Sequence, residues 1–112
     1  MSPLKIITRD THTGPVLEIT GELDHFHAPE LRRRLDTLPL RAGQRLVLDL
    51  AGMDFCDSSG ISALLTARNR AQAADADIAL AAVPARTLRI LHIVGLDRIF
   101  PLYPDTDTAI SA

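Results

Sequence analysis

Arg45-Leu46-Val47-Leu48-Asp49-Leu50 is the stretch that decides the fold. It is nearly continuous in apolar residues and only six residues long. Such a run is typical of a strand that is covered on both faces, whereas a strand with one face in water alternates apolar and polar residues. We therefore predict that residues 45–50 form the central strand of a sheet.

A helix is predicted shortly after this strand. A loop passes through Met53 and Phe55, and residues 57–60 follow it. Apolar side chains then recur at helical spacing to about residue 74, which predicts a helix with one buried stripe. The positions that define this periodicity are the apolar Ile61, Leu64 and Leu65, with Arg68 in the same phase.

The chain before the central strand predicts an antiparallel hairpin and a helix. Residues 4–8 and 16–20 are short runs rich in β-branched side chains, and residues 10–15 between them have the composition of a turn. Pro29 suits the first turn of a helix, and Pro39 ends that helix. Its apolar stripe consists of Ala28, Leu31, Leu35 and Leu38.

The rest of the chain predicts a strand, a helix and two weaker elements. Residues 77–83 read as a buried strand, and the apolar positions of residues 85–94 indicate a helix that ends before Gly95. A short edge strand is expected over residues 99–103 and a last helix over residues 106–112.

Strands that alternate with helices call for parallel pairing through right-handed crossovers, and the opening hairpin adds one antiparallel edge. The expected fold is α/β: a small mixed β-sheet of about four or five strands with helices packed mainly on one side. A chain of 112 residues can bury one sizeable core. We expect residues 1–112 to form a single domain.

The composition excludes several classes of partner. With three Phe, one Tyr, no Trp and a formal net charge of −2, the chain lacks the basic surface and the stacking side chains of nucleic-acid binders. No stretch reaches the roughly 18 apolar residues of a membrane span, and the N-terminus lacks the pattern of an export signal. The single cysteine cannot form an internal disulfide. We expect a cytoplasmic protein that binds neither nucleic acid nor membranes.

Few residues have the spacing that metal binding or catalysis requires. His25 and His27 are two residues apart, but the other histidines and Cys56 are distant in sequence, so we expect no metal and no cofactor. The two histidines are expected to be polar positions around a helix start, with Phe26 turned inward. Cys56 has apolar and acidic neighbours, which raise a thiol pKa, so it is expected to be a small core residue. A nucleotide site is disfavoured, because no glycine-rich phosphate loop with a lysine is present.

The tetrapeptide Asp57-Ser58-Ser59-Gly60 joins the central strand to the next helix, where backbone N–H groups lack partners. A purely structural interpretation is a helix cap, which contributes about 1 kcal/mol. Serine catalysis is not expected, since the segment does not read Gly-x-Ser-x-Gly. From local physics alone, the cap is the favoured interpretation.

The other interpretation is phosphorylation of a serine beside Asp57. A phosphoserine carries about −1.5 to −2 charge, and its repulsion from Asp57 grows when a docked partner excludes water. The helical phase continued back from Ile61 places Ser59 farther from the apolar stripe than Ser58. The residues therefore do not select Ser58 by themselves.

Three motifs occur in order along nearly the whole chain. They are Gly21-Glu22-Leu23-Asp24, then Leu46-Val47-Leu48-Asp49-Leu50 continued through Met53-Asp54-Phe55-Cys56-Asp57-Ser58-Ser59-Gly60, and finally Val83-Pro84-Ala85-Arg86-Thr87-Leu88-Arg89-Ile90-Leu91 with Gly95-Leu96-Asp97-Arg98-Ile99-Phe100. Together they resemble the anti-sigma factor antagonists of the STAS domain family. The resemblance implies a partner-switching regulator of transcription with no enzymatic activity of its own.

The resemblance also implies a partner and a modification. Unphosphorylated, the chain would bind an anti-sigma factor with serine kinase activity, which would then release its sigma factor. Phosphorylation would end the binding, and a phosphoserine phosphatase would restore it. In the family the modified serine directly follows the aspartate, which corresponds to Ser58. The partner-binding residues implied are Asp24, Asp57, Ser59, Gly60 and Ser62.

One departure from the family pattern concerns the residues after Gly60. The family often has Leu-Gly there, whereas this chain has Ile61-Ser62, so Ser62 is expected to help cap the helix or to contact a partner. His25-Phe26-His27 also lies in the partner-facing region implied by the family, where it could tune which kinase is recognised, but the favoured interpretation of these three residues is a solvated loop. The alternative to a switch is a STAS scaffold, or a subunit of a larger signalling or transport complex, in which Ser58 is not phosphorylated.

Overall fold

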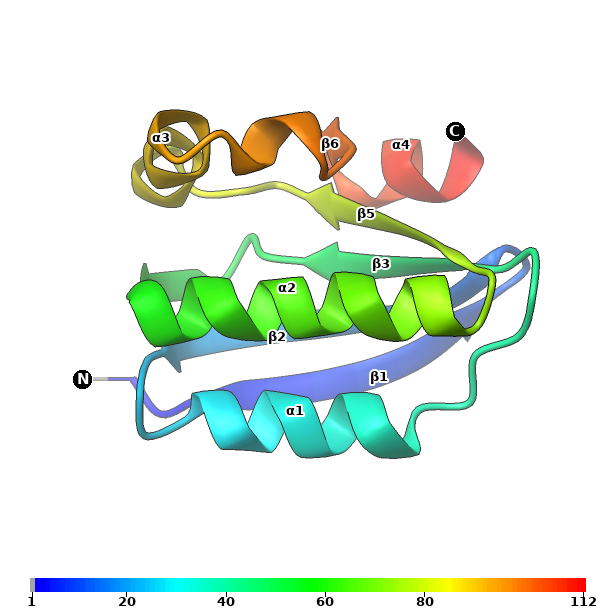
Figure 1. Ribbon diagram of the computed structural model, residues 1–112, viewed down its shortest axis with the longest axis horizontal. Coiled ribbons are helices and arrows are strands. Elements are labelled where there is room, and N and C mark those ends of the chain that lie inside the picture. Colours follow the sequence, from blue (N-terminus) through cyan, green and yellow to red (C-terminus); the bar gives the residue numbers. More distant parts are fainter. Residues whose placement is uncertain (1) are drawn as a thin grey trace.

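The computed structural model describes residues 2–112, in which strands and helices alternate after an opening hairpin (Figure 1). In chain order the elements are β1 (Lys5–Thr11), β2 (Gly14–Leu23), α1 (Ala28–Thr37), β3 (Arg45–Asp49), β4 (Met53–Cys56), α2 (Ser58–Ala73), β5 (Asp77–Ala81), α3 (Ala85–Ile93), the short 3-10 helix η1 (Leu96–Arg98), β6 (Leu102–Tyr103) and α4 (Thr106–Ser111). None of the helices in this part of the chain combines the length and the apolar character of a membrane span.

The sheet has the strand order β1-β2-β3-β5-β6, and β4 pairs with β2 beside this path. Among the strands of residues 2–112, only β1 and β2 are antiparallel to each other. Strand β3 lies between β2 and β5 and is parallel to both. This arrangement confirms the predicted α/β fold and the predicted central strand. The sheet of the described residues has six strands rather than four or five, because β4 is an additional strand.

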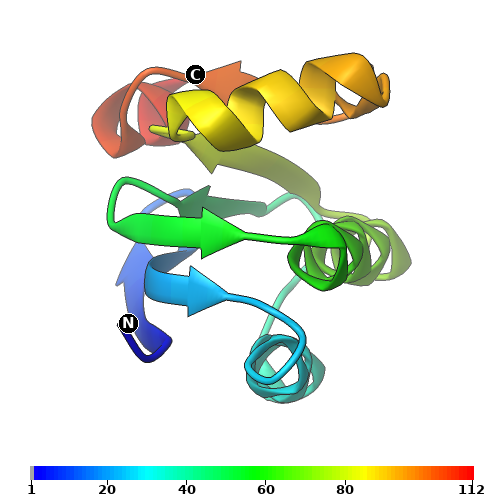
Figure 2. The ribbon, with the colours of Figure 1, turned by 90° about the vertical axis from the view of Figure 1, so that its left-hand side faces the viewer.

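Both faces of β3 are covered, which explains its continuous apolar sequence. Leu46 and Leu48 point into the larger core under α1 and α2, whereas Val47 points into a smaller cluster with Ala109 and Ile110 of α4. Successive side chains of a strand alternate between faces, so cover on both sides requires apolar residues at every position. Figure 2 shows α1 and α2 together on one side of the sheet, with α4 on the other.

The hairpin strands are longer than predicted. Residues 10–15 were expected to form the turn, but β1 and β2 leave only residues 12–13 between them. Thr11 Oγ1 donates to the Gly14 carbonyl at 2.8 Å and closes this tight connection. Gly14 has a φ of +142°, and an added Cβ there would collide with the Arg45 backbone. The turn therefore lies where its composition predicted, but it is shorter, because most of residues 10–15 belong to the ends of the two strands.

The predicted loop through Met53 and Phe55 is wrong, because these residues belong to β4. This strand is only four residues long, and its register with β2 shifts between Gly21 and Glu22. Gly21 N donates to the Gly52 carbonyl at 3.0 Å just before the shift. An irregular pairing of this kind leaves no alternating pattern in the sequence.

Candidate functional site

The Asp57-Ser58-Ser59-Gly60 segment lies at the end of the sheet where β2 and β4 finish. The last residues of these parallel strands, Leu23 and Cys56, are paired. The chain therefore leaves the sheet at two neighbouring points, once into residues 24–27 before α1 and once into the N-terminus of α2 (Figure 2). Residues that are 30 or so apart in sequence meet here because parallel strands end at the same edge.

The Asp57 carboxylate ties these two segments together. Oδ1 accepts a hydrogen bond from the backbone N–H of Gly60 at 3.0 Å, which confirms the predicted helix cap. Oδ2 accepts from the backbone N–H of His25 at 3.2 Å. One side chain thus satisfies a free N–H of α2 and also fixes the loop before α1.

Ser58 is exposed and Ser59 is half-buried, so the expectation that Ser59 lies farther from the buried side of the helix than Ser58 is wrong. The buried side of α2 is not centred on its large residues. It consists of Gly60, Ala63, Leu64, Ala67 and Ala71. Ser58 and Ser62 lie on the opposite side and are both exposed. Ser59 turns toward the other loop, and its Oγ lies 3.5 Å from His25 Nδ1.

Gly60 is buried where α2 meets the ends of β2 and β4. A Cβ added at this position would collide with the Leu23 carbonyl oxygen and lie 2.6 Å from Cys56 Sγ. Gly60 therefore allows close packing of the helix N-terminus and offers a partner no side chain. Cys56 is buried, as predicted, and burial together with the Asp57 charge raises the pKa of its thiol to about 12.

Asp24 stabilises its own loop. The hydrogen bonds of its side chain go to His27 and not to Ser58 or Ser59. Its Oδ1 accepts from the His27 backbone N–H at 3.0 Å and lies 2.7 Å from His27 Nδ1. Partial burial raises the pKa of Asp24, but the hydrogen bonds and charge of His27 outweigh it and lower that pKa overall. Asp24 therefore acts on the site by holding residues 24–27 in place.

Phe26 was expected to turn inward, and this expectation is wrong, because its side chain is 86% exposed. The inward positions of this connection are taken by Leu23 and Ala28, which are fully buried. The backbone between them makes a tight turn, in which the N–H groups of His27 and Ala28 donate to the Asp24 carbonyl. The turn leaves Phe26 at its outer tip.

The model of the STAS domain matches residues 5–109 of this chain. The chain belongs to the STAS family. An anti-sigma F factor antagonist from Paenibacillus polymyxa is 28% identical over 107 residues, which cover 94% of this chain and 92% of that protein. The crystal structure of an anti-sigma factor antagonist from Mycobacterium paratuberculosis is also 28% identical, with a TM-score of 0.80 over 96% of this chain and 92% of that one. These relatives confirm the resemblance that the three sequence motifs indicated.

A third similarity concerns the fold alone. SpoIIAA from Bacillus, solved in its phosphorylated form, is 18% identical to this STAS domain, with a TM-score of 0.72 over 96% of each chain. The anti-sigma factor antagonists among these relatives are regulators rather than enzymes.

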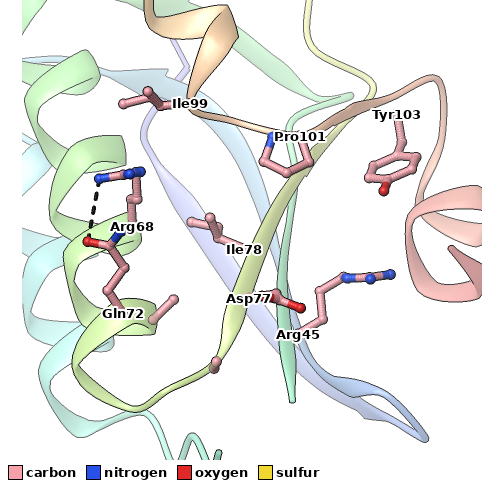
Figure 3. Close-up of a pocket in the computed structure, with 10 residues that line it drawn as sticks. Arg45, Arg68, Gln72, Asp77, Ile78, Ile99, Pro101 and Tyr103 are labelled. Carbon is pink, nitrogen blue, oxygen red and sulfur yellow. Dashed lines mark hydrogen bonds between the residues drawn. The ribbon is translucent and has the colours of Figure 1, made fainter. Parts of the chain in front are cut away.

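A hollow of about 360 Å³ lies away from the Ser58 surface, between α2, β5 and the segment that leads to β6 (Figure 3). Its polar side chains are already engaged or stand apart. Arg68 bonds to Gln72 at 3.4 Å, and Arg45 donates to the Ala109 carbonyl at 2.8 Å. Figure 3 shows Arg68 with Gln72 on one side of the hollow and Arg45 with Asp77 on the other.

Replacing Asp57 by alanine is expected to lower the free energy of unfolding by about 1–2 kcal/mol, because the cap of α2 is lost. The N–H of His25 loses its acceptor in the same variant, so amide hydrogen exchange should accelerate at His25 as well as at Gly60. Asp57→Asn keeps one acceptor oxygen in place of two, so it should retain the cap at Gly60 and most of the stability while exchange at His25 still accelerates. Unchanged exchange at His25 in Asp57→Ala would contradict the bridging role of this carboxylate.

Proposed function

We propose that this STAS domain is an anti-sigma factor antagonist that is switched by phosphorylation of Ser58. The observation that carries the proposal is the exposed Ser58 hydroxyl at the first residue of α2, directly after an aspartate that is held in place by two hydrogen bonds. Unphosphorylated, the domain binds a cytoplasmic anti-sigma factor with serine kinase activity, and the sigma factor is released. Phosphorylation ends the complex, and a phosphoserine phosphatase resets it.

The charge balance at Ser58 supports a switch that acts on binding rather than on folding. A phosphoserine carries about −1.5 to −2 charge. At a separation of about 5 Å, its repulsion from Asp57 is about 1.5 kcal/mol in water, and the helix N-terminus offsets about 0.3–1 kcal/mol of this. The free domain therefore tolerates the phosphate. In an interface that excludes water, the same repulsion is several times larger.

The residues around Ser58 divide into two roles in this proposal. Asp24, Asp57 and Gly60 shape the two segments through hydrogen bonds and close packing. Ser62 is exposed one helical turn after Ser58, so it contacts the partner directly. Ser59 contacts the partner through the part of its half-buried side chain that is not turned toward His25.

Incubation with ATP and the purified anti-sigma factor serine kinase from the same organism tests the proposal. Intact-mass spectrometry should show the addition of one phosphate to the wild type and to Ser59→Ala, but none to Ser58→Ala. Normal labelling of Ser58→Ala would show that the switch lies elsewhere. A large assembly in size-exclusion chromatography that forms without regard to kinase and ATP would favour the scaffold alternative.

A further inference from the structure

The most exposed large apolar side chain within residues 2–112 is Phe26, at 86%. It lies in the segment between β2 and α1 that adjoins the N-terminus of α2. Aromatic side chains, phenylalanine among them, are enriched in the buried cores of protein–protein interfaces. An exposed phenyl ring next to the N-terminus of α2 is therefore a candidate contact for a partner protein.

The structure fixes the backbone that presents Phe26. The residue before it, His25, donates its N–H to Asp57, and the residue after it, His27, is bound to Asp24 through both backbone and side chain. The His25 ring packs edge-on against the Phe26 ring, with centroids 5.9 Å apart and an angle of 68° between the planes. A backbone already fixed in this way loses little freedom when a partner binds.

Phe26 and Ser58 belong to one continuous surface. The link runs from Phe26 to its neighbour His25, whose N–H is bound by Asp57 and whose ring lies 3.5 Å from Ser59 Oγ. A kinase that transfers phosphate to Ser58 must cover this end of the molecule. Any protein that covers it also meets the Phe26 ring.

We infer that Phe26 is the anchor of the complex with the anti-sigma factor, and that its ring inserts into an apolar pocket beside the kinase's catalytic cleft. This inference rests on the proposed function and adds to it the feature by which the partner is recognised. Ser58 provides the group that is modified, whereas Phe26 provides apolar contact area that phosphorylation does not alter.

The test compares Phe26→Ala with Ile7→Ala. Ile7 is also an exposed apolar residue, at 43%, but it lies on β1 with its neighbour Ile6 pointing to the core under α1 and α2, so its own side chain is on the opposite sheet face. Affinity for the purified anti-sigma factor serine kinase is measured with ADP, which prevents phosphorylation. Phe26→Ala should weaken binding about 10- to 100-fold, and Ile7→Ala by less than about 3-fold.

Kinetics of Ser58 phosphorylation provide the second readout. In Phe26→Ala the KM for the domain should rise about as much as the dissociation constant, while kcat stays within about 3-fold of wild type, because the anchor is remote from the transferred phosphoryl group. Thermal unfolding should match wild type, since the ring is exposed. Loss of kcat with unchanged KM would overturn the anchor role.

The outcomes separate the inference from the proposal beneath it. Wild type that is phosphorylated at Ser58, together with Phe26→Ala that binds normally, overturns the anchor alone. A kinase that neither binds nor phosphorylates the wild type overturns both. If sedimentation shows self-association that Phe26→Ala abolishes, the ring occupies a second copy of the chain and the inference is wrong.

Discussion

Ser58→Asp is expected to weaken binding to the anti-sigma factor by about 30- to 1,000-fold, which corresponds to about 2–4 kcal/mol. The variant places a second carboxylate beside Asp57 on a surface that loses water when the partner docks. Two like charges brought into a medium of lower dielectric repel each other more strongly, and the complex bears that cost while the free domain does not. Titration calorimetry with the purified anti-sigma factor measures the difference.

Two control variants separate the effect of the added charge from the effects of side-chain size and of position on the surface. Ser58→Asn has nearly the shape of Ser58→Asp without its charge, so it should bind clearly better than the aspartate variant. Asn69→Asp adds the same charge to an exposed position near the other end of α2 and should change affinity by less than about 3-fold. Equal affinities of wild type, Ser58→Asp and the phosphorylated domain would remove the switch even if the phosphate is found.

Gly60→Ala is expected to lower the free energy of unfolding by about 3 kcal/mol, at the upper end of the range for overpacked sites. The new methyl group would collide with the Leu23 carbonyl oxygen and crowd Cys56 Sγ. A backbone oxygen at the end of a strand cannot move aside as a flexible side chain can. The N-terminus of α2 must shift instead, so binding through Ser58 should weaken together with stability.

Gly43→Ala is the matched control for this substitution. Gly43 has a φ of +82°, but no atom lies within 4 Å of an added Cβ. Its cost is therefore backbone strain alone, about 1–2 kcal/mol. Urea denaturation of both variants makes the comparison, and a Gly60→Ala variant as stable as Gly43→Ala would mean that α2 does not depend on close packing at Gly60.

The fold could be predicted because burial of β3 and of one side of α1 leaves regular apolar patterns in the sequence. Residues 45–50 are apolar throughout since β3 is buried on both sides, and the stripe of α1 keeps regular helical spacing. β4 was not predicted because a four-residue strand with a shifted register depends on β2 for its pairing and not on its own pattern. The apolar pattern of a sequence therefore indicates which residues are buried, but it does not indicate where strands pair irregularly.

The candidate site was predicted only in part. Capping by Asp57 follows from residue type and position, and the structure confirms it. The exposure of Ser58 did not follow, because the phase of α2 was taken from large residues such as Ile61, whereas the helix packs closely through Gly60 and a row of alanines. The link from Asp57 to His25 joins residues 32 positions apart, and only the pairing of β2 with β4 brings them together.

The bridge between the two loops uses the main-chain N–H of His25 and no atom of its side chain. Every amino acid except proline supplies that donor. The side chain at position 26 can consequently be exchanged without loss of the Asp57 bridge, and exchange at position 25 removes only the contact of its ring with Ser59 Oγ. Related domains in one cell could thus diverge in whom they recognise and keep the same chemistry, which would insulate parallel signalling pathways from one another.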